Sequence, residues 1–425
     1  MSQPVASTDL LIKTYKQRWV QLSIFVLFNF SNATLWITYA SIATLSSQYY
    51  NVSLSDINWL SLVYMVVFIP LGFSCTWLIN KHLKYALVCG GFLNCLGAWI
   101  RYAAGPNFAW ALFGQILAAI AQPFALNSTT KMASTWFPEK ERTVANAIMS
   151  LCNPIGIAFA SILVPALVSV PSDLPIPLLI LAIISTFSFI LMFLLKRNPE
   201  TPPSITSLVE NISFKQSIIN ACKHKPFLIL ALVFGIQVGL FNAISTDIQQ
   251  ILDPYGYTPE DAGYCSAAFI LSGLIFAGII APFVDKRGNH VIVLKIFLGL
   301  LSVLYLAFTL SLHPNLFVLI LLINVALGAF TFALLPIALE LGVEVTYPDL
   351  PEATSNNILW TLGQIFGIII LLVMDQLRII NQMIIGMWLC TAMAIIASIM
   401  ILFFKGTTKR RAFEEEIGMT SNNKR

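Results

Sequence analysis

Twelve apolar segments, each long enough to cross a lipid bilayer, constrain this chain more than any other feature of its sequence. A membrane-spanning helix needs about 20 predominantly apolar residues to cross roughly 30 Å of hydrocarbon. The sequence is 57% hydrophobic and 10% charged, whereas an average soluble domain is about 25% charged, so a soluble fold is excluded. The predicted spans are 19–45, 57–79, 83–104, 108–136, 142–169, 176–195, 226–252, 261–284, 290–312, 315–345, 351–374 and 380–404.

The lysine and arginine residues indicate how these spans are oriented. Nearly all of them fall before the first span, after the second, fourth, sixth and eighth spans, or after the last, and the opposite side carries essentially Arg101 and Arg378. Because cytoplasmic loops are enriched in basic residues, both termini are predicted to be cytoplasmic. The predicted organisation is a tail over 1–18, a six-helix half over 19–197, a polar linker over 198–225, a second six-helix half over 226–404 and a tail over 405–425.

The two halves echo each other at a constant offset. Asn32 falls on Asn242 and Pro138 on Pro348, and both pairs are 210 residues apart (242 − 32 and 348 − 138). Two six-helix copies in the same orientation are the organisation of major facilitator transporters, whose substrate site lies near the bilayer midplane between the halves. The predicted fold class is therefore an all-α membrane protein with twelve transmembrane helices in two pseudo-symmetric halves, the major facilitator fold.

Polar residues inside the first span mark a candidate site. Asn29 and Asn32 stand among apolar residues there, and an unsatisfied amide in lipid costs several kcal/mol. We therefore expect both to face other protein or a wet cavity. Because the repeat relates Asn32 to Asn242, we expect these two amides to face each other across the halves, where they would suit a hydroxyl or a primary amine.

Five stretches of the sequence are distinctive: Ser31–Trp36, Ile57–Tyr64, Leu93–Trp99, Ala133–Phe137 and Glu340–Pro348. They resemble the feline leukaemia virus subgroup C receptor-related family of solute carriers, within the major facilitator superfamily. The resemblance covers nearly all twelve spans. The sequences Ser-Asn-Ala-Thr-Leu-Trp and Trp-Phe-Pro-Glu bring it closest to the third, least characterised branch of that family.

The resemblance implies a substrate and a binding site. Better-known members carry choline and ethanolamine, and were earlier described as haem exporters. Of the residues that form their choline site, the tryptophan corresponds to Trp36 and the two glutamines to Gln122 and Gln364, while the tyrosine falls at Asn242. One aromatic wall is therefore missing. Trp36, Gln122 and Gln364 each also have a purely structural interpretation. For example, the Gln122 amide would donate to the backbone carbonyl that has no partner because Pro123 lacks an N–H.

The missing wall leaves two alternatives open. A cation–π contact contributes roughly 0.5–2 kcal/mol per ring, whereas micromolar binding needs about 8 kcal/mol, so one tryptophan cannot hold a quaternary ammonium alone. Either Phe241, Tyr39 or Tyr64 supplies the second wall, or the substrate is not choline.

Charged residues at the predicted cytoplasmic ends of the fourth and tenth spans are candidate gating residues. Lys131 lies on one half and Glu340 and Glu344 on the other, so they would latch the cytoplasmic side shut while the cavity opens outward; a solvated rim is the alternative. The loop that contains Asp285 and Arg287 resembles the cytoplasmic loop signature of the superfamily.

The ionisable residues favour facilitated diffusion. All four histidines fall in loops and no central acid is visible in the first, second, fourth or fifth span, so a proton relay is not indicated and a uniporter is expected. The acid Asp247 has two interpretations: a counter-ion for a cationic substrate, or a hydrated carboxylate near the outer end. The repeat aligns Trp36 with Thr246, which favours the hydrated carboxylate.

Other function classes lack their motifs. The seven cysteines include no Cys-x-x-Cys, so neither a metal nor a cofactor is indicated. The basic residues form no stripe for nucleic acid, and no hydrolase, zinc-protease or P-loop motif indicates an enzyme. The expected partners are a small-molecule substrate and the lipid bilayer of the plasma membrane, with a monomeric protein. The rivals are a transporter of haem or another amphipathic solute, and a receptor that does not transport.

Overall fold

The computed structural model of the chain describes residues 15–199, 221, 223–287, 290–346, 350 and 352–405. Regular secondary structure in these residues is helical, with no strands. The first half contains α1 Gln17–Ile37, η1 Ala40–Ile42, α2 Ala43–Tyr50, α3 Leu54–Ala103, α4 Phe108–Leu126, α5 Thr129–Trp136, α6 Glu139–Leu167, η2 Pro171–Asp173 and α7 Pro175–Met192. The second half contains α9 Lys225–Leu252, η4 Asp253–Tyr255, α10 Pro259–Arg287, α11 His290–Leu310, α12 Phe317–Thr346, α13 Glu352–Ile379 and α14 Met383–Leu402.

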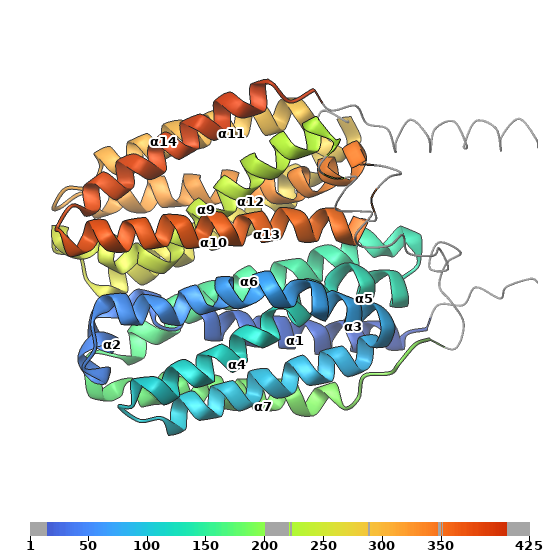
Figure 1. Ribbon diagram of the computed structural model, residues 1–425, viewed down its shortest axis with the longest axis horizontal. Helices are drawn as coiled ribbons and strands as arrows, with labels where there is room; N and C mark the ends of the chain where they lie inside the picture. The colour runs from blue at the N-terminus through green and yellow to red at the C-terminus, as the bar shows by residue number, and fades with distance from the viewer. Residues whose placement is uncertain are drawn as a thin grey trace, which may run out of the picture.

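Eleven helical segments of the described residues are long and apolar enough to cross a membrane, and one of them contains two crossings. Helix α3 has 50 residues, about 75 Å at 1.5 Å per residue, which is more than twice the hydrocarbon thickness. Its backbone leaves helical geometry at His82, with φ −145° and ψ 68°. Figure 1 shows the chain reversing direction there, so α3 holds the two predicted spans 57–79 and 83–104.

Two predicted spans are broken into shorter helices. The span predicted at 19–45 ends as α1 at Ile37 and resumes through η1 and α2. The span predicted at 108–136 divides into α4 and α5 between Leu126 and Thr129. The other spans differ from the predictions mainly at their ends; the predicted 226–252, for example, is α9.

The helices form two bundles that lie side by side (Figure 1). Between the bundles, α3 packs against α13 and α6 packs against α10, and the hydroxyls of Ser161 and Ser266 lie 3.0 Å apart across the second contact. Small residues permit close approach within each bundle; a Cβ at Gly328, for example, would overlap the backbone of Phe269.

The two bundles together have two ends, and both matter for the site. Helix α1 begins and α14 finishes at the same end (Figure 1), which we call the terminal end. The opposite end, which carries α2, η4 and the start of α14, is called the distal end. The predicted tails and linker fall largely on residues 1–14, 200–220, 222 and 406–425, which lie outside the described residues.

Candidate functional site

Trp36 lies at the point where α1 breaks, and side chains from two neighbouring helices hold that break. The carbonyl of Leu35 accepts hydrogen bonds from Arg101 Nη1 at 3.1 Å and from Gln115 Nε2 at 3.2 Å. Gln115 also donates to the carbonyl of Leu60 at 2.8 Å. A helix end leaves carbonyls without an intrahelical partner, so these donors compensate the break and fix the position of Trp36. Gln115 thus joins α4 to both α1 and α3.

Arg101 is buried in the interior of the first half rather than exposed in a loop. Only 1% of its surface is exposed. Its guanidinium lies 5.0 Å from the ring centroid of Tyr39, and its Nε donates to the Tyr39 hydroxyl at 3.4 Å. Because a cation near a helix C-terminus is favourable, Arg101 stabilises the end of α1. Arg101 thus lies in the last turn of α3, inside the span predicted at 83–104.

The indole of Trp36 faces an aromatic cluster in the second half. The ring centroids of Trp36 and Phe241 are 6.5 Å apart. Phe241 in turn stacks on Phe269 at 5.8 Å and meets Phe332 edge-on at 5.4 Å. Of the three candidates for a second wall, Phe241 is therefore the one in ring contact with Trp36. The Nε1 of Trp36 is buried and has no hydrogen-bond partner among the described residues.

An amide pair lies beside this aromatic cluster. Asn242 follows Phe241 on α9, and its Nδ2 donates to the Oε1 of Gln364 on α13 at 3.4 Å. The same nitrogen lies 3.9 Å from the sulfur of Met65 on α3. Residues from α1, α3, α9 and α13 therefore bring two rings and two amides together between the halves. A substrate with both an apolar surface and hydrogen-bond donors would match this combination.

Asn32 does not face Asn242. Its Nδ2 donates to Asn94 Oδ1 and to the carbonyl of Ala118, both at 2.9 Å. The Nδ2 of Asn94 donates in turn to the hydroxyl of Ser31 at 3.0 Å. Both donor hydrogens of Asn32 are thus used to pack α1 against α3 and α4 within the first half. The expected amide pair across the halves is not formed, and Asn32 is a packing residue in this structure.

Gln122 is buried on α4 and makes no hydrogen bond to the described part of the chain. It precedes Pro123, which is inside α4. Its amide therefore does not satisfy a carbonyl freed by that proline. Substrate contact stays the prediction for Gln122.

A polar network joins the halves at the distal end. Asn58 on α3 donates to Asp375 Oδ1 on α13 at 3.1 Å and to Gln250 Oε1 on α9 at 3.3 Å. Gln250 Nε2 donates back to Asn58 Oδ1 at 2.6 Å. Arg378 Nη2 bonds Asp375 Oδ1 at 2.7 Å and the hydroxyl of Ser55 at 2.8 Å. Hydrogen bonds between the halves therefore hold the distal end closed.

Asp247 is buried next to this network. Only 1% of its surface is exposed, so the interpretation of a simply wet carboxylate was wrong. Gln250 Nε2 lies 3.4 Å from its Oδ1, and its Oδ2 has no partner among the described residues. Asp247 was identifiable from the sequence as an acid inside a span, whereas Asn58, Gln250 and Asp375 were not predicted. The available signal for these three was a polar residue near the distal end of each span.

The predicted gating residues lie near the terminal end. Lys131 is half-buried on α5, Glu340 is exposed on α12 and Glu344 is buried on α12. Asp285 and Arg287 occupy the end of α10, and their side chains lie outside the described residues. No cluster of three or more potential metal ligands occurs in the described part of the chain.

Comparisons with known proteins agree with this architecture. The Major Facilitator Superfamily profile matches residues 23–349. Solute carrier family 49 member A3 of Xenopus tropicalis is 35% identical over 385 residues, covering 86% of this chain and 79% of that protein. Choline/ethanolamine transporter flvcr2a of Danio rerio is 32% identical over 434 residues, covering 97% of this chain and 91% of that protein.

A solved structure shows the same arrangement of helices. The crystal structure of a D-xylose–proton symporter matches with a TM-score of 0.68, covering 92% of this chain and 98% of that chain. The sequence identity is 14%, so this similarity concerns the fold alone.

Proposed function

Because the chain belongs to the major facilitator superfamily and, within it, to solute carrier family 49, the feline leukaemia virus subgroup C receptor-related family, we propose that it carries a small amino alcohol of the choline and ethanolamine class by alternating access. It is a multi-pass membrane transporter rather than an enzyme. The observation that carries the proposal is the group of rings and amides between the halves, formed by Trp36, Phe241, Asn242 and Gln364.

The geometry of this group favours a primary ammonium over a quaternary one. Trp36 and Phe241 are in contact with each other, so they do not stand as two walls on opposite sides of a cation. The carbonyl oxygens of Asn242 and Gln364 accept hydrogen bonds, and ethanolamine has N–H donors that choline lacks. Hydrogen bonds to charged groups contribute about 1.5–3 kcal/mol each, more than a typical cation–π contact. Ethanolamine is therefore the preferred substrate of the two.

The orientation and mechanism follow from the two ends of the bundle. Most basic residues fall before the first predicted span, after the second, fourth, sixth and eighth, or after the last, which supports a cytoplasmic terminal end and a distal end that faces outward across the plasma membrane. Alternating access requires the distal network to open so that the Trp36 group meets the outer solution. Of the four histidines, only His290 falls in a predicted span, as its first residue, which supports a uniporter that works by facilitated diffusion.

Uptake of labelled ethanolamine and choline into cells that express the protein tests this proposal. We expect saturable uptake with ethanolamine preferred. Trp36→Ala should abolish it, while Trp388→Ala, at a tryptophan that is 45% exposed on α14, should leave it intact. Asn242→Tyr should raise choline uptake relative to ethanolamine. Absence of uptake of either compound by protein at the cell surface would contradict the proposal and favour an amphipathic solute or a receptor.

A further inference from the structure

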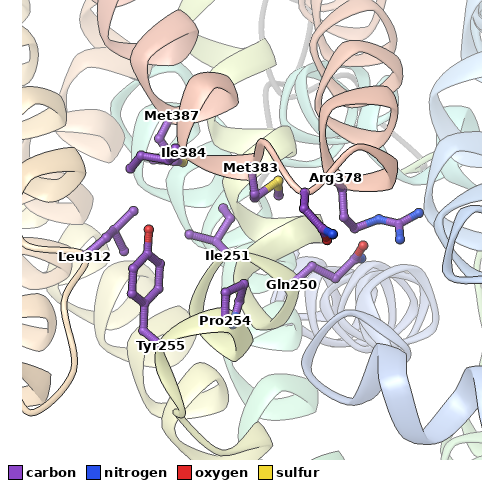
Figure 2. A pocket seen from close by; sticks show the side chains of 10 residues that line it. Gln250, Ile251, Pro254, Tyr255, Leu312, Arg378, Met383, Ile384 and Met387 are labelled. Carbon is purple, nitrogen blue, oxygen red and sulfur yellow. The ribbon is translucent and has the colours of Figure 1, made fainter.

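A cavity of about 340 Å³ lies at the distal end of the second half. Residues of α9, η4, α13 and α14 line it. Figure 2 shows Gln250 and Arg378 on one side, with Tyr255 and Leu312 on the other. Two of its lining residues, Gln250 and Arg378, also belong to the network that joins the halves. The cavity therefore adjoins the closed distal interface.

Asp247 lies one helical turn beneath a residue that lines this cavity, Gln250. On each of three helices, the residue three positions deeper than a lining residue is ionisable: Asp247 beneath Gln250, Asp375 beneath Arg378 and Cys390 beneath Met387. Residues three apart on a helix occupy one face. Gln250 connects the two levels, because it lines the cavity and lies within 3.4 Å of Asp247 Oδ1. Asp247 is thus separated from the cavity by one layer of side chains.

The charges around Asp247 do not balance. The charged groups close enough to influence it are Asp375 and Arg378 of α13, and the ionisable groups nearby are Cys390 of α14 and Tyr305 of α11. Arg378 already pairs with Asp375 at 2.7 Å. Two carboxylates and one guanidinium leave one negative charge in excess among these groups. A buried charge without a partner costs several kcal/mol, so closure of the distal network is unfavourable unless this charge is compensated.

We propose that Asp247 binds one monovalent cation, a proton or a sodium ion, that arrives through the distal cavity, and that this neutralisation completes the closed distal interface. The Oδ2 of Asp247, buried and unpartnered, is the binding atom. Since the cavity lies at the distal end, the cation exchanges with the solution on that side. The site regulates the uniporter of the proposed function, and it rests on that function for its effect on transport and for the outward orientation of the distal end.

Thermal unfolding of the purified full-length protein tests the site without any transport assay. The midpoint is measured in acidic and alkaline buffer, each with sodium or with N-methyl-D-glucamine as the cation. Binding to the folded state raises the midpoint, here by on the order of 2–4 °C. Asp247→Asn, which removes the excess charge, should abolish this dependence. The matched control Asp253→Asn, at an exposed carboxylate at the end of the same helix, should keep it.

Two comparisons of buffer conditions identify the cation. A midpoint that rises on acidification without sodium, in the wild type and Asp253→Asn but not in Asp247→Asn, assigns a proton. A midpoint that rises with sodium in alkaline buffer, with the same pattern among variants, assigns sodium. The proposal is overturned if the unfolding midpoint of Asp247→Asn depends on pH or sodium as the wild type does, or if the wild-type midpoint depends on neither. Ethanolamine uptake by Asp247→Asn should also become insensitive to the pH and the sodium concentration outside the cell. If the wild type takes up no ethanolamine, the proposed function fails, and the unfolding midpoints still test cation binding at Asp247.

Discussion

Asn58→Ala should open the distal end of the protein. The side chain makes three hydrogen bonds between the halves, two with Gln250 and one with the carboxylate of Asp375. Neutral bonds contribute about 1 kcal/mol each and a bond to a charged group about 2 kcal/mol. Because one nitrogen serves two of these bonds, we take the loss as about 3 kcal/mol, which shifts the balance between closed and open distal ends about 100-fold.

Cysteine accessibility measures this shift. Ser61 lies one turn deeper than Asn58 on α3 and is buried, so Ser61→Cys should react slowly with a membrane-impermeant thiol reagent added from the distal side. In the Asn58→Ala background, Ser61→Cys should be labelled much faster. The labelling of the native cysteines, measured without Ser61→Cys, is subtracted as the baseline. The matched control is Asn94→Ala, which removes a buried amide whose bonds to Ser31 and Asn32 stay within the first half. Equal labelling in Asn58→Ala and the parent, or an equal increase in Asn94→Ala, would refute the role of this network.

Three further predictions concern the frame around the site. Gln115→Ala leaves the buried carbonyl of Leu35 with one donor fewer, so the free energy of unfolding should fall by about 1–3 kcal/mol and the ethanolamine KM should rise; thermal unfolding and uptake kinetics check this. Gly328→Ala forces a methyl group into the backbone of α10, whereas Gly299→Ala meets open space; size-exclusion chromatography should show loss of folded protein only for the first. Lys131→Glu should favour opening of the terminal end, and unchanged reactivity of a cysteine placed in the inner cavity would contradict the latch.

The spans themselves were predictable because apolar length is a local property of the sequence. The predicted 226–252 and 290–312 correspond to α9 and α11 within a few residues. The break after Ile37 was not predictable in this way, since residues 38–43 contain neither glycine nor proline. Donors from other helices, Arg101 and Gln115, compensate that break. Such compensation depends on tertiary packing, which hydropathy does not report.

The candidate site was predictable only in part. The resemblance to the family pointed to Trp36 and Gln364, and the structure brings both to the interface between the halves. The repeat pointed to Asn32 as the partner of Asn242, but sequence equivalence does not determine which face of a helix meets the other half. The distal network was missed because its bonds join residues far apart in the sequence, such as Asn58 and Asp375, and because the predicted eleventh span stopped at residue 374, one position before Asp375.

The central claim is that an amino alcohol crosses the membrane through the group of Trp36, Asn242 and Gln364 between the halves. Exchange of labelled ethanolamine across liposomes that contain only the purified protein tests it most directly. We predict saturable exchange that choline inhibits weakly and that Trp36→Ala and Gln364→Ala each reduce at least tenfold, the equivalent of about 1.4 kcal/mol. Liposomes with folded wild-type protein and no exchange above empty liposomes, or exchange that both variants retain in full, would contradict it.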